Sequence, residues 1–169
     1  MPTNTHAGTK KIVPFLWYAK EAEEAARFYA SVFPDSHVDR VSAMQADSPS
    51  GPPGSVSVVD FTLFGKPFMA MSAGPHDDFN DAVSFAVNCD SQDELDRYWD
   101  AILRHGGKPQ ACGWINDRYG VRWQIVPTVL GEMMADRDPV KAKRVAEEMM
   151  SQVKFDIAKL TAAYEGRKP

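Results

Sequence analysis

Hydrophobic residues along the chain recur with the spacing of a strand in some segments and with the spacing of a helix in others. The same order of segments occurs twice, about 70 residues apart. In the first copy, residues 12–18 form a β-branched and aromatic run that predicts a strand. Residues 20–32 place their apolar side chains at helical spacing, with charged residues between them. Two-residue alternation then predicts three more strands, at 38–46, 55–64 and 68–71.

The second copy begins with the apolar run 82–89, which predicts a strand. Ser91 and Glu94 have the spacing of a capping box, in which two side chains cap the first turn of a helix. Gly106 and Gly107 end the apolar stripe of that helix. Three short strands are predicted after them, at 108–111, 113–118 and 121–126.

This order of strand, helix and three strands predicts an α+β protein built from two βαβββ modules. A helix covers one face of its own sheet, so we expect the other face of each sheet to line a cleft. The predicted organisation is a disordered lead-in, two modules and a helical tail, at residues 1–10, 11–73, 82–127 and 132–169.

The tail after Pro127 has a different composition and predicts two C-terminal helices. Asp138 followed by Pro139 is typical of a helix start, and residues 140–152 continue at helical spacing. Residues 156–164 predict the second helix. Both helices are amphipathic, so the tail must bury an apolar stripe on its own domain or on a partner chain.

Charge and composition exclude several classes of function. The net charge is 19 − 23 = −4 and the basic residues are scattered, so we expect no nucleic-acid partner. No apolar run is long enough to cross a bilayer, and the first residues lack the apolar core of a signal peptide. We therefore expect no membrane partner, a cytoplasmic location and reduced cysteines. Without a CxxC pair, a structural zinc site is not expected.

Residues 111–128 combine large aromatic side chains, a cysteine and few polar groups. This is the composition of a small-molecule pocket, in which apolar area gives affinity and a few polar groups orient the ligand. It is also the composition of a core strand with its hairpin, because aromatic residues dominate protein cores. Candidate ligand-binding residues from the whole chain are Phe15, Trp17, Phe85, Cys112, Trp114 and Gln124.

Strand periodicity decides which of these side chains can reach a cleft, because alternate residues on a strand point to opposite faces. Phe15 and Trp17 should therefore share one face of the first strand. In the last strand, Gln124 should face the wet cleft, since burying its amide against the helix is costly. Trp123 should then lie under the helix.

Cys112 and the charged pair that follows it each have two interpretations. A cation near Cys112 would lower the pKa of the thiol and make this residue a candidate nucleophile. The alternative, a buried small hydrophobe, is favoured because no histidine is placed to activate the thiol. Asp117 and Arg118 are interpreted as an ion pair in a surface turn, with a place at the mouth of the cleft as the alternative.

Four segments of the chain, taken in order, carry a resemblance to one family. They are PFLWY with EAEEAARFYASVFPDS, SFAVNCDSQDELDRYWDAI, CGWINDRYGVRWQIVPT and DPVKAKRVAEEMM. The chain resembles the PhnB-like family, labelled 3-demethylubiquinone-9 3-methyltransferase, in the vicinal oxygen chelate superfamily of glyoxalases, bleomycin resistance proteins and dioxygenases. The resemblance implies two curved, mixed and mostly antiparallel sheets around a shared cleft, and a homodimer.

Metal-using members of this superfamily hold their metal with His, Glu or Gln at four strand positions. By resemblance, these positions fall at Val13 or Pro14, at Met71 or Ser72, at Ser84 and at Gln124. Only Gln124 can be a ligand, and a single amide oxygen does not hold a transition metal. The four histidines lie elsewhere, at His6, His37, His76 and His105. We therefore expect no metal and no cofactor.

The family label names a methyltransferase, but the chain lacks the glycine-rich strand-to-helix turn at which parallel sheets bind nucleotide-type methyl donors. The predicted function is binding of a small, partly apolar molecule in the cleft of a metal-free homodimer. One alternative is a superfamily enzyme, either metal-dependent like the glyoxalases and dioxygenases or a methyltransferase. The other is a structural dimer without a ligand.

Overall fold

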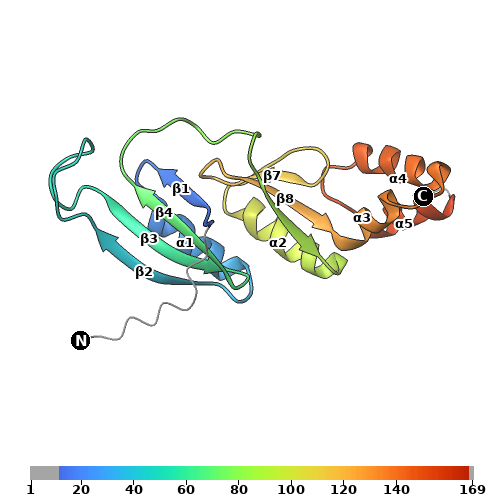
Figure 1. The fold of residues 1–169 in the computed structure, drawn as a ribbon. Coiled ribbons are helices and arrows are strands. Elements are labelled where there is room, and N and C mark those ends of the chain that lie inside the picture. The colour runs from blue at the N-terminus through green and yellow to red at the C-terminus, as the bar shows by residue number, and fades with distance from the viewer. Residues whose placement is uncertain (1–11, 168–169) are drawn as a thin grey trace. The chain divides into compact units, whose positions relative to one another are not determined.

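The computed structural model describes residues 12–167 of the chain, which folds into two compact units (Figure 1). One unit extends to Asp77 and the other begins at Asp78. Within residues 12–167, no helix is both long and apolar enough to span a bilayer. The predicted disordered lead-in, residues 1–10, lies outside the described residues. The predicted module boundaries and the shared cleft stay predictions.

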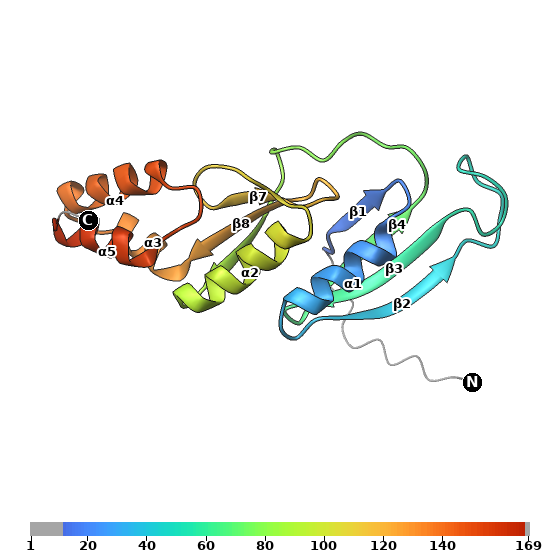
Figure 2. The ribbon, with the colours of Figure 1, turned by 180° about the vertical axis from the view of Figure 1, so that it is seen from behind.

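The first unit is a four-stranded sheet with one helix. Its elements are β1 (Phe15–Tyr18), α1 (Ala22–Val32), β2 (His37–Ala43), β3 (Ser57–Leu63) and β4 (Lys66–Ser72). The strand order is β1-β4-β3-β2, with β1 parallel to β4 and the other two pairs antiparallel. Figure 2 shows α1 lying across one face of this sheet.

The buried layer of the first unit follows the predicted periods. α1 buries four residues at helical spacing: Ala22, Ala25, Ala26 and Tyr29. β3 buries every second residue from Val59 to Leu63, as a strand covered on one face does. The hydroxyl of Tyr18 in β1 lies 3.2 Å from that of Tyr29 in the same layer. β1 begins three residues later than predicted, after Pro14, which has no backbone N–H to donate to a ladder.

The second unit repeats this topology. Its first elements are β5 (Phe85–Cys89), α2 (Gln92–Arg104), β6 (Lys108–Pro109), β7 (Trp114–Asn116) and β8 (Arg122–Pro127). The strand order is β5-β8-β7-β6, with β5 parallel to β8 and the other pairs antiparallel. α2 buries Leu95, Tyr98, Trp99 and Ile102. The predicted α+β fold with two strand–helix–three-strand repeats is confirmed.

The start of α2 differs from the predicted capping box in one bond. The Ser91 hydroxyl accepts a hydrogen bond from the backbone N–H of Glu94 at 3.2 Å, as predicted. The Glu94 carboxylate, however, accepts from the N–H of Asp90 at 2.8 Å instead of the N–H of Ser91. The side chain therefore reaches one residue further back, and it still satisfies a backbone donor near the helix start.

The tail contains three helices, one more than predicted: α3 (Thr128–Met134), α4 (Pro139–Ser151) and α5 (Ile157–Glu165). α3 follows β8 directly, and its start has no side-chain cap that the sequence could reveal. The predicted start of α4 is confirmed, because the Asp138 carboxylate accepts from the N–H of Val140 at 2.9 Å. Val145 of α4 and Leu160 of α5 are fully buried.

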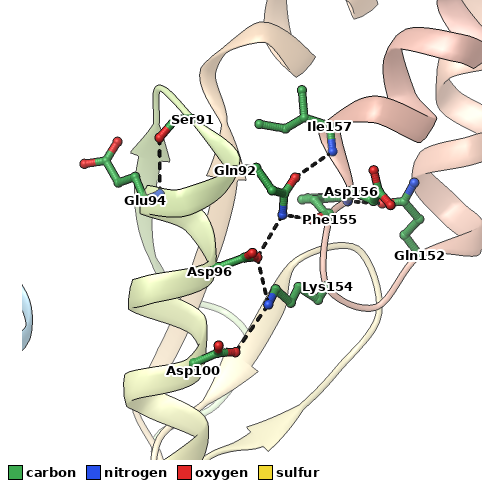
Figure 3. A network of polar contacts seen from close by, with 10 residues as sticks. All are labelled: Ser91, Gln92, Glu94, Asp96, Asp100, Gln152, Lys154, Phe155, Asp156 and Ile157. Carbon is green, nitrogen blue, oxygen red and sulfur yellow. Dashed lines mark hydrogen bonds and ion pairs between the residues drawn. The ribbon is translucent and has the colours of Figure 1, made fainter.

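The segment between α4 and α5 attaches the tail to α2 (Figure 3). The ammonium of Lys154 lies 2.7 Å from a carboxylate oxygen of Asp96 and 3.3 Å from one of Asp100. The amide of Gln92 donates to the carbonyl of Phe155 at 3.0 Å and accepts from the N–H of Ile157 at 2.9 Å. The tail thus packs within its own unit, where Val145, Phe155 and Leu160 are buried, while Val140, Met150 and Val153 stay exposed.

Removing the Lys154 ammonium should loosen the tail in a pH-dependent way. The hydrogen bond from Lys154 lowers the pKa of Asp96. Burial lowers the pKa of Lys154, but hydrogen bonds to Asp96 and Asp100 outweigh it and raise that pKa overall. The stabilisation from the contact between Lys154 and Asp96 is therefore lost at pH values below the ordinary pKa range of a carboxyl group, as Asp96 becomes protonated. It is also lost at pH values above the ordinary pKa range of lysine, as Lys154 loses its proton.

Between those limits, Lys154→Met should cost about 0.5 to 1 kcal/mol, because the three side chains are partly exposed. The measurement is amide hydrogen exchange in α5 at several pH values. Lys159→Met, which changes an exposed lysine of α5, is the control and should leave exchange unchanged. Equal exchange in both variants at neutral pH would contradict the prediction.

Candidate functional site

Each helix leaves the opposite face of its own sheet uncovered, and the candidate site lies on these open faces. In β1, Phe15 and Trp17 are 48% and 40% exposed, whereas Leu16 and Tyr18 are buried. The predicted sharing of faces in this strand is confirmed. Large aromatic side chains exposed together are more informative than single exposed ones, because contiguous apolar patches mark interaction sites.

The open face of the first unit is apolar where β1 meets β4. Met69 pairs in register with Phe15, and Met71 pairs with Trp17. The indole N–H of Trp17 donates to the carbonyl of Gly74 at 3.1 Å, which fixes the orientation of the ring. Methionine side chains are flexible and polarizable, so they can adapt to the shape of a bound molecule. The surface therefore combines one fixed ring with adaptable neighbours.

The same face becomes polar toward β2. Arg40 and Asp60 form an ion pair of 2.6 Å between β2 and β3. The hydroxyl of Thr62 donates to the carboxylate of Asp39 at 3.0 Å. Asp60 and Thr62 alternate with the buried residues of β3, so they lie on the open side. The open face thus offers an apolar part beside a hydrogen-bonding part.

In the second unit, β8 alternates as predicted. Trp123 and Ile125 are buried, whereas Gln124 is half-buried on the open face. Trp114 of β7 pairs in register with Gln124, so its side chain also lies on the open face. The amide of Gln124 donates to the hydroxyl of Ser84 at 2.8 Å. The predicted positions of Trp123 and Gln124 on opposite faces are confirmed.

Two candidate residues lie away from the open faces. Phe85 pairs in register with Trp123, and the two rings are 5.5 Å apart, so Phe85 is on the covered side of its sheet. Cys112 lies in the turn before β7, where its backbone N–H donates to the carbonyl of Gln152 at 2.8 Å. A ligand-binding role for either residue stays a prediction. The structure brings the other four candidates onto open faces: Phe15 and Trp17 in one unit, Trp114 and Gln124 in the other.

The second cysteine, Cys89, is buried in β5. Burial raises the pKa of its thiol to about 12, and the negative charges of Glu94 and Asp90 act in the same direction. Such a thiol forms almost no thiolate near neutral pH, and the thiolate is the reactive form. Cys89 is therefore an inert part of the core.

Asp117 is the residue whose surroundings the sequence interpretation missed. Its side chain is 4% exposed, so the predicted position in a surface turn is wrong. One carboxylate oxygen accepts from the indole N–H of Trp123 at 2.9 Å. The other accepts from the backbone N–H groups of Tyr119 and Val121 at 2.9 and 3.0 Å. An aspartate at the first position and a glycine at the fourth, as in Asp117 to Gly120, is typical of a β-turn, and it could have indicated this arrangement.

Asn116 is a second residue that was not among the predicted site residues. It lies in β7 two residues after Trp114, and therefore on the same open face. Its side-chain oxygen is buried and has no hydrogen-bond partner among the described residues. Nothing in the local sequence signals this, because the partners of a strand side chain come from neighbouring strands.

The positions that the resemblance suggests for a metal do not provide a ligand set here. Met71 carries a thioether, and the hydroxyl of Ser72 accepts the backbone N–H of Ala22 at 3.1 Å. Ser84 and Gln124 are hydrogen-bonded to each other. Across residues 12–167, no group of three or more His, Cys, Asp or Glu side chains is arranged to hold a metal ion. These residues do not fit a transition metal, which requires several such ligands.

Solved structures similar to this chain share its fold. A putative 3-demethylubiquinone-9 3-methyltransferase, a PhnB protein from Bacillus cereus, is 30% identical, with a TM-score of 0.62, over 70% of this chain and 100% of that one. A protein from Pseudomonas aeruginosa is 25% identical, with a TM-score of 0.51, over 68% and 95% of the two chains. The fosfomycin resistance protein FosX from Listeria monocytogenes, solved with Mn(II) and sulfate, is 17% identical over 69% and 88%, with a TM-score of 0.50.

These likenesses and the two repeated modules define the two-module, glyoxalase-like α+β fold. The sequence model of the family described as 3-demethylubiquinone-9 3-methyltransferase matches residues 10–126. The chain belongs to this family, and the predicted resemblance is confirmed. A search among curated proteins found no match. The matched residues end before α3, so the three tail helices lie outside the part that defines the family.

Proposed function

We propose that this protein is a metal-free member of its family that binds a small, partly apolar molecule on the open face of a sheet. The observation that carries the proposal is the apolar surface of the first unit, where Phe15 and Trp17 remain exposed beside Met69 and Met71. Apolar surface of this kind supplies affinity, and polar groups on the same face, such as Asp60 and Thr62, supply orientation.

The chemistry of the metal positions supports the metal-free part of the proposal. The hydroxyl of Ser72 accepts the backbone N–H of Ala22 at the start of α1, and the hydroxyl of Ser84 accepts an N–H of the Gln124 amide. Recruiting them as ligands would break these bonds and would still supply no imidazole or carboxylate. We therefore assign these groups to structure and to ligand orientation.

The family name describes a methyltransferase, and the local structure argues against a nucleotide-type methyl donor. Such donors bind at a glycine-rich turn between a strand and a helix of a parallel sheet. The turns before α1 and α2, residues 19–21 and 90–91, contain no glycine, and two of the three strand pairs in each sheet are antiparallel. Binding without methyl transfer is the function that this arrangement favours.

We further propose that the protein is a homodimer in the cytoplasm. The family resemblance supports the dimer, and its mass can be read in the same experiment that tests ligand binding. The superfamily enzyme and the structural dimer without a ligand are the two other outcomes of that experiment.

The test is a native mass spectrum of protein purified from its own host, with metal analysis of the same sample. We expect the mass of a dimer, a retained small organic molecule and no stoichiometric metal. About one equivalent of divalent metal per chain that resists chelation would overturn the metal-free proposal and favour an enzyme. A bare dimer that also takes up no small apolar compound in a thermal-shift screen would favour the structural alternative.

Two variants locate the binding surface. Trp17→Ala removes the fixed ring from the open face of the first unit and should release a molecule bound on that face. Phe64→Ala is the matched control, because it removes an aromatic ring of similar exposure from the turn between β3 and β4. Equal retention by both variants would move the site away from this face.

A further inference from the structure

The strongest unassigned feature of the chain is the unpaired oxygen of Asn116. Within the described residues, this oxygen is the buried side-chain N or O atom that lacks a hydrogen-bond partner. Proteins rarely leave such atoms unpaired, because burying an unsatisfied acceptor costs the full penalty of removing it from water. An unpaired buried acceptor therefore points to a donor that comes from outside the chain.

The neighbouring donors are already engaged. Arg122 pairs in register with Asn116, yet its guanidinium donates to the carboxylate of Asp81 at 2.8 Å and to the carbonyl of Gly120. The amide N–H of Gln124 is directed to Ser84. Neither residue donates to Asn116. On the other side, Lys108 of β6 pairs in register with Asn116, and its exposed side chain makes no hydrogen bond to the Asn116 oxygen either.

The surroundings of Asn116 show what kind of molecule fits. Gln124 is its diagonal neighbour across β7 and β8 on the open face, and its amide oxygen is left to accept a bond. Trp114 is on the same face and offers a half-buried ring. Two acceptor oxygens beside an aromatic ring suit a ligand with a flat apolar part and hydroxyl or N–H donors.

We propose that Asn116 is a specificity-determining residue that accepts a hydrogen bond from a hydroxyl or N–H group of a molecule bound on the open face of the second unit. This inference rests on the proposed binding function and adds the chemical class of the ligand: a small ring compound that carries hydrogen-bond donors. Trp114 contacts the ring, and the oxygen of Gln124 is the second acceptor. A molecule of the same shape without a donor leaves Asn116 unpaired and binds more weakly.

Phenol and anisole test the donor requirement, because they share a ring and differ by one O–H. Both are titrated into the full chain, and binding is followed by NMR shifts of backbone amides in β7 and β8. We expect phenol to bind the wild type roughly tenfold more tightly than anisole, as one hydrogen bond to a buried acceptor allows. Asn116→Leu should remove this difference, and Asn116→Asp, which keeps an acceptor oxygen, should retain it.

Asn88→Leu is the matched control, since Asn88 is an exposed asparagine on the open face of β5. It should leave the preference for phenol intact. Equal binding of phenol and anisole by the wild type would overturn the inference and leave the proposed binding function standing. Binding of neither compound would also overturn it, whereas the native mass spectrum decides the binding function separately.

A second readout needs no ligand. If the partner of Asn116 is a ligand, Asn116→Leu removes a buried acceptor that is unpaired in the free protein. The unfolding midpoint of this variant in urea should then equal or exceed that of the wild type. A purely structural asparagine gives the opposite result, because its loss breaks bonds within the protein. A clear fall in the midpoint of Asn116→Leu, with Asn88→Leu unchanged, would overturn the proposal.

Discussion

The Gly113→Ala variant should lose about 3 to 5 kcal/mol of stability, from backbone strain and steric overlap together. Gly113 has a φ of +76°, which is unfavourable for alanine. A Cβ there would lie 2.8 Å from the carbonyl oxygen of Ile125 and would overlap the ring of Phe155. The oxygen belongs to the backbone of β8, and Phe155 is held through Gln92, so neither can withdraw cheaply. The measurement is urea unfolding followed by tryptophan fluorescence.

Gly120→Ala separates the two causes. Gly120 has a φ of +89°, but the nearest atoms to its added Cβ are 3.8 Å away, an ordinary contact distance. This control should cost only the backbone term, about 1 to 2 kcal/mol. If both variants lose the same free energy of unfolding, the close approach of Phe155 to Gly113 contributes nothing to the cost of Gly113→Ala, and the prediction is wrong.

The Asp117→Ala variant should lose about 3 kcal/mol, because three donors lose their common acceptor. The indole of Trp123 and the backbone N–H groups of Tyr119 and Val121 all donate to this carboxylate. All three would be left around a small void. Asp117→Asn should fall between the wild type and the alanine variant, since its oxygen can serve some of the donors while its NH2 opposes another.

Asp81→Ala is the control for removing a carboxylate. Asp81 is 63% exposed and pairs with Arg122 at the surface, so its loss should cost less than about 1 kcal/mol. Unfolding in urea measures all three variants under the same conditions. A loss below 1 kcal/mol for Asp117→Ala would mean that water replaces the carboxylate, which contradicts its role as a buried acceptor.

Much of the fold follows from local patterns. Alternation in β1 and β8 placed Phe15, Trp17 and Gln124 on open faces and Trp123 on a covered one, and the burial of these residues confirms it. The second repeat and the start of α4 were also predicted, because hydrophobic period and the pair Asp138-Pro139 are local signals. α3 was not predicted, since Pro127 gives its start no side-chain cap.

The candidate site was predictable only in part. The alternation of side chains along a strand shows which of them share a face, but it does not show which polar atoms find hydrogen-bond partners. Asp117 therefore looked like a surface residue, although the turn that follows it folds back around its carboxylate. The sequence did not predict the unpaired oxygen of Asn116. Whether that oxygen finds a partner depends on the hydrogen bonds that residues of the adjacent strand make.

By itself, the sequence determined the two repeats, the faces of their strands and the family to which the chain belongs, because hydrophobic period and matched segments are properties of contiguous residues. Only the tertiary structure decided that the tail packs within the second unit and that Asn116 remains unpaired. These outcomes depend on contacts between residues far apart in the chain, such as Gln92 with Phe155, and a pattern read along the sequence does not encode them.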